Sequence, residues 1–193
     1  MKARTEIPAL LNELGLTGEG VEIGVLEGDY SEFLLSNWQG KKLHLVDIWK
    51  TQPGNFQFTV AKWDAMIAHV NQRLDRFRDR YLIHRMSSVD AAKQFADESL
   101  DFIYIDADHH LAAVVADLKA WYPKLKHGGL FSGHDYFLKI GRPTMQKISG
   151  QWKAVANLEV KKAVDAFASA NQIAKIELTE ERDTNITWWW IKP

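Results

Sequence analysis

Short continuous apolar runs alternate along the chain with longer stretches in which apolar residues recur every three or four positions. The continuous runs are typical of strands buried on both faces, and the longer stretches are typical of amphipathic helices. The predicted strands lie at residues 21–26, 43–47, 81–83, 100–105 and 129–131. The predicted helices lie at residues 7–14, 63–77, 89–96, 111–118 and 160–167. This alternation predicts a parallel sheet covered on both faces by right-handed crossovers.

The two ends of the chain add further elements to this pattern. The first helix belongs to an N-terminal segment at 1–17, and two more strands are predicted near 175–178 and 186–191, as a hairpin around Asp183-Thr184-Asn185. A chain of 193 residues is long enough for one large α/β core. We therefore expect residues 1–193 to form a single domain with a Rossmann-like, doubly wound and mostly parallel sheet.

Composition is typical of a soluble globular protein. Apolar residues make up 46% of the chain and the net charge is −1, so we expect neither nucleic acid nor an acidic surface as a partner. The absence of cysteine excludes disulfides, thiolate metal ligands and a cysteine nucleophile, and it fits a cytoplasmic location. Neither a signal-peptide core nor a membrane-spanning stretch is recognisable, so we expect no membrane partner.

A glycine-containing turn follows the first predicted strand. The sequence Glu22-x-Gly24-x-x-x-Gly28 leads into a helix, and glycines in such a turn let the backbone approach a ligand closely. Asp47, about twenty residues further on, is placed where a ribose diol would be bound. The carboxylates of Glu22 and Glu27 would repel a pyrophosphate, so the pattern favours a nucleoside without phosphates.

This turn resembles the cofactor site of class I S-adenosylmethionine (SAM) dependent methyltransferases. The resemblance implies that the loop binds the methionyl part of SAM, that Asp47 binds the ribose, and that the last strand of the sheet is antiparallel. Residues near Ile48 and Ser87-Ser88 would meet the adenine. Ile48 and Trp49 could flank the adenine ring, and core packing explains them nearly as well. A helix cap is an equal explanation for Ser88. The residues predicted to bind SAM are Glu22, Gly24, Glu27, Gly28, Ser31, Asp47, Ile48, Ser87, Ser88 and Asp106.

Acidic and imidazole side chains follow two neighbouring predicted strands. Asp106, Asp108 and His109 come after the fourth strand, and His134-Asp135 come after the fifth. Ligands of parallel sheets bind at the carboxyl ends of the strands, so we expect these side chains in one crevice beside the cofactor. Carboxylates with an imidazole suit Mg²⁺ or Mn²⁺, with zinc or iron as alternatives.

The same region resembles one small-molecule subfamily of these enzymes, which includes macrocin O-methyltransferase-like and cephalosporin-hydroxylase-like proteins. The resemblance covers residues 18–170 and rests on Asp106-Ala-Asp108-His109, Asp117-Leu118, Leu125-x-x-Gly128-Gly129, His134-Asp135 and the helix at 160–167. In metal-dependent members, an Asp after strand four and an acidic or amide pair after strand five bind Mg²⁺. The resemblance implies Asp106, His134 and Asp135 as metal ligands. The imidazole of His134 departs from that pair and leaves the identity of the metal open.

Methyl transfer requires the acceptor oxygen to lie in line with the methyl group and to lose its proton. We assign Asp106 to metal binding and catalysis. His109 is the preferred general base, because an unperturbed imidazole titrates near neutrality. A cap on the following helix is the alternative for Asp108 or His109.

Two further segments have candidate roles. Residues 136–157 show little periodicity and are predicted to form a long loop, either a lid over the acceptor or a surface excursion without substrate contact. Trp188 to Trp190 are consecutive in a predicted strand, so Trp189 should face one side of the sheet and its neighbours the other. Sheet packing or a self-association patch, and hence a homo-oligomer, would explain them better than a substrate cage.

The sequence thus predicts a SAM-dependent methyltransferase that acts on the oxygen of a small hydroxylated molecule with help from a divalent cation. One alternative is an NAD(P)-dependent oxidoreductase, which the missing Gly-x-Gly-x-x-Gly motif disfavours. The other alternative is a SAM-binding regulatory protein without catalytic activity.

Overall fold

A computed structural model describes residues 1–52, 57–136, 143–148, 151–157, 159–180 and 186–193 of the chain. Its main sheet has seven strands in the order β3-β2-β1-β4-β5-β9-β8. The parallel strands are β1 (Glu19–Ile23), β2 (Lys42–Asp47), β3 (Tyr81–Arg85), β4 (Leu100–Ile105) and β5 (Leu125–Gly133). β9 (Trp188–Ile191) runs antiparallel to β5, and β8 (Glu177–Leu178) runs antiparallel to β9. The predicted α/β, doubly wound sheet with an antiparallel end is therefore confirmed.

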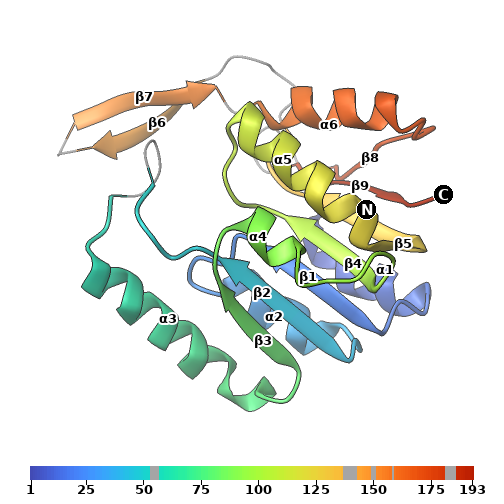
Figure 1. Cartoon of the computed structure of the whole chain (residues 1–193), viewed down its shortest axis with the longest axis horizontal. Helices are drawn as coiled ribbons and strands as arrows, with labels where there is room; N and C mark the ends of the chain where they lie inside the picture. Colours follow the sequence, from blue (N-terminus) through green and yellow to red (C-terminus); the bar gives the residue numbers. More distant parts are fainter. Residues whose placement is uncertain (53–56, 137–142, 149–150, 158, 181–185) are drawn as a thin grey trace.

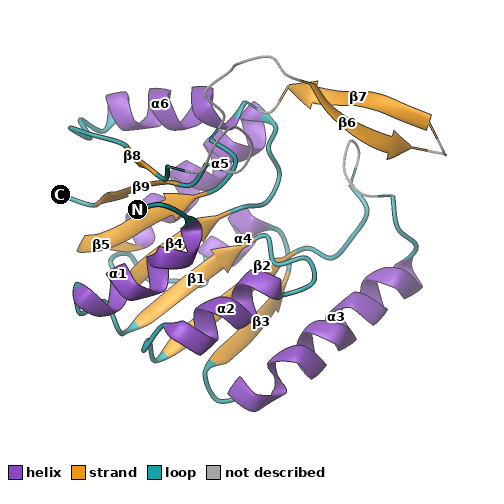
Figure 2. Ribbon diagram, turned by 180° about the vertical axis from the view of Figure 1, so that it is seen from behind, coloured by secondary structure: helices purple, strands orange, loops and turns teal. Residues whose placement is uncertain are grey.

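Helices cover both faces of the sheet, as Figures 1 and 2 show. One layer contains α1 (Ile7–Glu13), α2 (Asp29–Asn37) and α3 (Val60–Leu74), and the opposite layer contains α4 (Ser88–Ala92), α5 (Leu111–Trp121) and α6 (Val160–Ala170). Short 3₁₀ turns are η1 (Arg4–Glu6), η2 (Asp75–Phe77) and η3 (Tyr122–Lys124). The helix expected at 89–96 is shorter than predicted and ends at Ala92. None of the described helices is long and apolar enough to cross a membrane.

Each layer of helices buries its own apolar cluster against the sheet. Trp188 and Trp190 lie in the cluster beneath α5 and α6, with their ring centroids 5.1 Å apart, whereas Trp189 packs against the cluster on the other face. The predicted alternation of the three tryptophans is therefore confirmed. Trp188 and Trp190 are almost fully buried, so sheet packing accounts for these two side chains.

The segment at 136–157 differs from the loop that the sequence predicts. Its described part contains two antiparallel strands, β6 (Pro143–Ile148) and β7 (Gln151–Asn157), which form a sheet separate from the main one. This hairpin extends beyond the helices in Figure 1. The paired backbones satisfy each other's hydrogen bonds, so the hairpin needs no marked hydrophobic periodicity. The turn expected at Asp183-Thr184-Asn185 lies outside the described residues.

Hydrogen bonds hold the chain at two points beside the carboxyl edge, one after β5 and one just before α6. After β5, the backbone N–H of Tyr136 donates to Ile186 over 3.0 Å, and its hydroxyl donates to Asp165 of α6 over 2.5 Å. Before α6, the backbone N–H of Glu159 donates to the carbonyl oxygen of His109 over 3.2 Å. We call residues 137–158 the insertion. The residues that flank it, Tyr136 and Glu159, are thus held by hydrogen bonds near the ends of β5 and β4.

Candidate functional site

Gly24 stands where three strand ends converge. Its backbone N–H donates to Val46 at the end of β2 over 2.9 Å, and the neighbouring Ile23 carbonyl accepts from Asp106 after β4 over 2.7 Å. Gly24 has φ +90°, and a Cβ there would overlap the carbonyl oxygen of Asp106. Only glycine meets both requirements, so the predicted turn depends on this residue for its geometry.

The rest of the loop leads directly into α2. Gly28 has φ +77° and is the residue before the first turn of this helix, while Leu26 adopts φ +51°. The side chain of Glu27 is exposed. The loop therefore presents backbone and one exposed carboxylate at the carboxyl edge of β1, as the predicted cofactor turn requires.

Asp47 ties this loop to the end of β2. One carboxylate oxygen accepts from the backbone N–H groups of Val25 and Leu26 over 2.9 and 3.0 Å, and the other accepts from Trp49 over 2.9 Å. Asp47 therefore shapes the loop as well as standing at the position predicted for a ribose ligand. Trp49 is fully buried in the core, so core packing explains it, whereas Ile48 is only partly buried.

Glu22 lies behind the loop and not within it. Its carboxyl is buried and accepts a 2.5 Å hydrogen bond from the hydroxyl of Ser31, which is also buried. Burial raises the pKa of Glu22 to about 8, so this carboxyl is mostly protonated at neutral pH. The expectation that two carboxylates repel a phosphate is therefore wrong for Glu22, and Glu27 alone supplies the exposed charge. Burial of the Glu22 side chain decides this difference, and the sequence pattern does not reveal it.

Ser87 and Ser88 have structural partners at the start of α4. The Ser87 hydroxyl accepts from the backbone N–H of Asp90 over 3.2 Å and is the N-cap, the role that the sequence offered for Ser88. The Ser88 hydroxyl instead accepts from the indole of Trp121 over 2.8 Å. Both residues remain at the end of β3, where the adenine was predicted.

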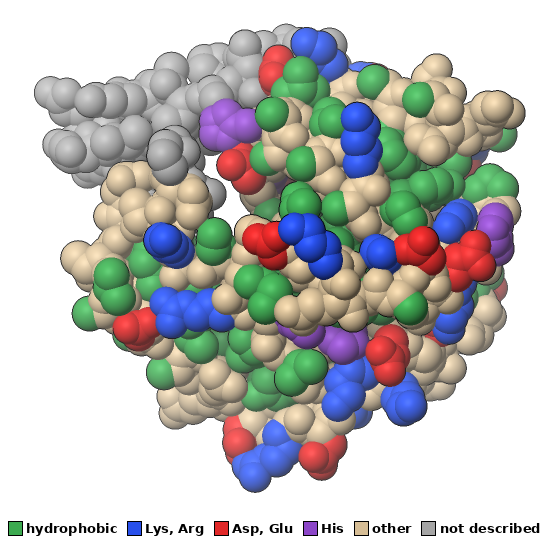
Figure 3. Space-filling view, in the orientation of Figure 1, with side chains coloured by type: hydrophobic (Ala, Val, Ile, Leu, Met, Phe, Trp, Pro, Cys, Tyr) green, Lys and Arg blue, Asp and Glu red, His purple; other side chains and the backbone are tan. Residues whose placement is uncertain are grey.

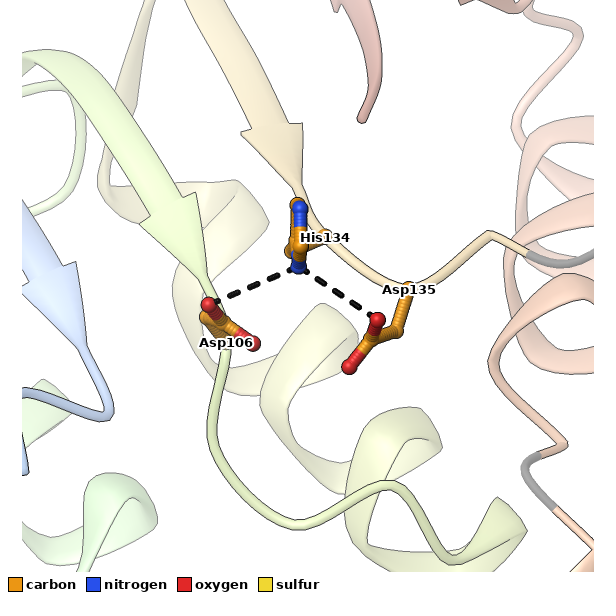
Figure 4. A group of neighbouring side chains, drawn as sticks. All are labelled: Asp106, His134 and Asp135. Atoms are coloured by element: carbon orange, nitrogen blue, oxygen red, sulfur yellow. Dashed lines mark ion pairs between the residues drawn. The ribbon is translucent and has the colours of Figure 1, made fainter. Parts of the chain in front are cut away.

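Asp106, His134 and Asp135 form the central cluster of the carboxyl edge. Figure 4 shows their side chains converging from the ends of β4 and β5. The Nδ1 atom of His134 lies 3.7 Å from a carboxylate oxygen of Asp106 and 3.4 Å from one of Asp135. One donor atom from each residue fits within 4.8 Å of the others, which is the spacing of a set of metal ligands. The structure therefore brings together the three predicted ligands.

His109 joins the cluster from the start of the loop before α5. Its Nε2 atom lies 3.4 Å from Asp106 and 3.3 Å from Asp135, on the carboxylate oxygens that do not face His134. Burial lowers the pKa of His109, but the neighbouring carboxylates of Asp106 and Asp135 outweigh it, so that the pKa is raised overall. Burial raises the pKa of Asp135, but the imidazoles of His134 and His109 outweigh it, so that the pKa is lowered overall.

Asp108 and His110 stay outside this cluster. The carboxylate of Asp108 accepts from the backbone N–H of His110 over 2.9 Å, just before the first residue of α5. The side chain of His110 is exposed. Asp108 therefore holds the backbone just before α5, but the N-cap residue is His110 and no side chain caps the helix, so the helix-capping alternative describes neither Asp108 nor His109.

Arg4 is a site residue that the sequence argument missed. Its guanidinium lies 3.6 Å from the carboxylate of Asp106 and 4.8 Å from the ring centroid of Tyr30. Burial lowers the pKa of Arg4, but Tyr104, Asp106 and Tyr30 raise it overall. No motif marks this arginine, because its partners are distant in the sequence and the fold alone brings them together.

Comparison with known families matches residues 21–136 to a methyltransferase domain. This range runs from the glycine loop to the His134-Asp135 edge and covers more than half of the chain. The chain belongs to this methyltransferase family. The assignment makes the protein a SAM-dependent methyltransferase and supports the cofactor interpretation of the loop over the NAD(P) alternative. A comparison with curated protein sequences finds no significant match.

Solved structures similar to this methyltransferase share its fold at low sequence identity. A putative rRNA methylase from Clostridium thermocellum is 13% identical, with a TM-score of 0.63 over 100% of this chain and 99% of that one. A putative O-methyltransferase from Klebsiella pneumoniae is 13% identical, with a TM-score of 0.61 over 98% and 79% of the two chains. An O-methyltransferase from Bacillus cereus in complex with SAH is 14% identical, with a TM-score of 0.61 over 97% and 80%.

Proposed function

We propose that this methyltransferase acts on an oxygen of a small hydroxylated acceptor, with a divalent cation bound by Asp106, His134 and Asp135. The observation that carries the proposal is the cluster of carboxylates and imidazoles at the carboxyl edge, beside the glycine loop. Methyl transfer to an unactivated hydroxyl needs a means of removing its proton, and this cluster offers both negative ligands and a base.

The chemistry of the donor set fits a divalent cation. Two carboxylates and an imidazole that converge within 4.8 Å bring together two negative charges that a cation would neutralise. A bound cation would supply positive charge that favours the deprotonated form of the acceptor hydroxyl. With an imidazole in the set, Mn²⁺ suits the site at least as well as Mg²⁺, and zinc or iron remains an alternative.

His109 is the residue to which we assign proton removal. Its Nε2 atom faces both carboxylates and lies within 3.4 Å of each, so it borders the position of the acceptor oxygen that the proposal implies. SAM supplies the methyl group and leaves as S-adenosylhomocysteine when its carbon–sulfur bond is replaced by the new oxygen–carbon bond. The acceptor's proton passes to His109.

The glycine loop, which lies against the backbone of Asp106, is the proposed cofactor site. Backbone from Gly24 to Gly28 would meet the methionyl part, and the carboxylate of Asp47 retains lone pairs for a ribose hydroxyl beside its three backbone bonds. Ile48, Ser87 and Ser88 border the proposed adenine position. Glu22 and Ser31 would act indirectly, by supporting the loop from behind.

Charge distribution favours a small molecule over nucleic acid as the acceptor. Four of the five arginines between residues 73 and 85 are paired with acidic residues: Arg73 with Asp29, Arg76 with Glu32, Arg78 with Asp75 and Arg85 with Asp64. The fifth, Arg80, donates to backbone carbonyl oxygens. Figure 3 likewise shows basic and acidic side chains interspersed over the face it presents. Nucleic-acid binding draws on a continuous basic surface, which these pairs would interrupt.

Metal binding and turnover test the proposal together. Mn²⁺ binding is measured by titration calorimetry, and methyl transfer is measured as S-adenosylhomocysteine release from SAM with a panel of catechols, flavonoids and hydroxylated sugars. Asp135→Asn removes one ligand charge and should abolish both. Asp108→Asn is the matched control, because Asp108 lies near the same edge outside the cluster, and it should retain both.

Three outcomes would contradict the proposal in different ways. Normal Mn²⁺ binding by Asp135→Asn would refute the ligand assignment. Turnover of the wild-type protein that survives complete chelation would refute the role of the cation. Tight SAM binding with no turnover on the acceptor panel or on amine acceptors would favour the non-catalytic alternative.

A further inference from the structure

The N-terminal arm, residues 1–6, lies against the cofactor side of the site. Its backbone is held at two points: the Met1 carbonyl accepts from the N–H of Glu180 over 3.1 Å, and the Arg4 carbonyl accepts from the Tyr30 hydroxyl over 3.1 Å. Tyr30 belongs to α2, the helix that the glycine loop begins. The position of Arg4 is therefore tied to the element that frames the proposed methionyl site.

The Arg4 guanidinium is held in place by its neighbours and can still bind an anionic ligand. It lies over the ring of Tyr30 at 4.8 Å, a geometry in which cation and ring attract each other. Its distance of 3.6 Å from Asp106 is too long for a direct charge-assisted hydrogen bond. About one third of the side chain, 35%, is exposed. A carboxylate that enters beside Asp106 could thus bind this guanidinium without displacing a short ion pair.

The other arginine close to the loop is already neutralised. Arg73 of α3 approaches Gly28, but it forms a close ion pair with Asp29 and lies 3.9 Å from Glu32. Arg4, in contrast, stands beside Asp106 at the point where β1 and β4 end. Among the described arginines near the loop, Arg4 is the one placed to balance a second negative charge at this edge.

We propose that Arg4 binds the carboxylate of the methionyl part of SAM, an inference that rests on the proposed cofactor site. The methionyl part carries a carboxylate and an ammonium group. Without a cation between them, its carboxylate would face Asp106 at a partly buried edge, which is unfavourable. Arg4 offers a planar, bidentate partner for the carboxylate, while Asp106 remains close enough to attract the ammonium group.

Comparison of two nucleosides by titration calorimetry tests this role without measuring turnover. S-Adenosylhomocysteine carries the amino-acid part, and 5′-methylthioadenosine lacks it. Arg4→Gln should weaken S-adenosylhomocysteine binding about tenfold to a hundredfold and leave 5′-methylthioadenosine binding within about twofold. Arg73→Gln, the matched control on the other side of the loop, should bind both nucleosides as the wild-type protein does.

If Arg4→Gln folds poorly, a comparison of two ligands on the wild-type protein tests the same role. The wild-type protein should bind decarboxylated S-adenosylhomocysteine as weakly as Arg4→Gln binds the intact compound. Unchanged S-adenosylhomocysteine affinity in Arg4→Gln, equal losses for both nucleosides, or wild-type affinity for the decarboxylated compound would each overturn the role of Arg4. If the wild-type protein binds neither nucleoside, the proposed cofactor site itself is refuted.

Discussion

The indole N–H of Trp49 donates a 2.9 Å hydrogen bond to the carbonyl oxygen of Leu26, and it thereby joins two residues in the left-handed region. Leu26 has φ +51° and Trp49 has φ +39°, conformations that are unfavourable for bulky side chains. The Asp47 carboxylate accepts hydrogen bonds from the backbone N–H groups of both residues. The surrounding hydrogen bonds therefore hold the glycine loop in a conformation that it would not adopt alone.

Trp49→Phe should release this loop while keeping most of the buried apolar surface. We expect the free energy of unfolding to fall by about 0.5–1.5 kcal/mol, because the partly buried hydrogen bond to the Leu26 carbonyl is lost, and S-adenosylhomocysteine binding to weaken. Urea denaturation and calorimetry measure the two effects. Trp38→Phe is the control, because the Trp38 indole donates a similar 2.7 Å bond to Leu16 away from the loop. A control that lost nucleoside affinity equally would contradict the specific role of Trp49.

Gly24→Ala should destabilise the protein more than substitution of a glycine that has only an unusual backbone angle. The added Cβ would overlap the Asp106 carbonyl oxygen at φ +90°, so we expect a loss of roughly 3 kcal/mol or more. Gly15→Ala adds a Cβ with no atom within 4 Å at φ +69°, and it should cost only about 1 kcal/mol. Equal losses in chemical denaturation would show that the strand ends can separate.

Glu22→Gln should remove a specific pH dependence of stability. The folded-state pKa of Glu22, about 8, lies above that of the unfolded chain, so the unfolded state releases this proton first. Wild-type stability should therefore be greatest below the unfolded pKa and decline as the pH rises toward 8, by at most about 1.4 kcal/mol per pH unit. The difference between wild-type and Glu22→Gln unfolding free energies, measured from pH 5 to pH 8, isolates this group. A difference that stays constant over that range would contradict the raised pKa.

Substitutions of the two histidines should separate metal binding from proton removal. His134→Gln should lose Mn²⁺ binding and turnover together. His109→Gln should keep most of its Mn²⁺ affinity but lose about 10²- to 10⁴-fold in kcat, the usual contribution of a general base. Calorimetry and SAM turnover with the same acceptor give the comparison. Loss of Mn²⁺ binding in His109→Gln would instead make His109 a ligand.

Local sequence patterns predicted the main sheet and the residues at its carboxyl edge well. Apolar runs marked β1 to β5, and the order of strands and helices placed Asp106, His109, His134 and Asp135 at one edge, because parallel strands end together. Gly24 was also identified correctly as a turn residue. These features depend on composition over a few neighbouring positions and on general rules of topology.

Features that depend on burial or on distant contacts could not be predicted in this way. The protonation of Glu22 follows from its burial against Ser31, and the position of Arg4 follows from how the N-terminal arm meets Tyr30 and Asp106. The β6–β7 hairpin lacked a clear pattern because it is paired with itself and lies apart from the main sheet. Each of these required the three-dimensional arrangement of the chain.

Hydrogen bonds anchor the chain on both sides of the insertion. Tyr136 is hydrogen-bonded to Ile186 and to α6 on one side, and Glu159 is hydrogen-bonded to His109 on the other. Both anchors therefore lie beside the carboxyl edge of the main sheet. The hydrogen bonds that support the glycine loop and the contacts within the ligand cluster lie outside these two anchors, so the chain between Tyr136 and Glu159 could be replaced without removing them.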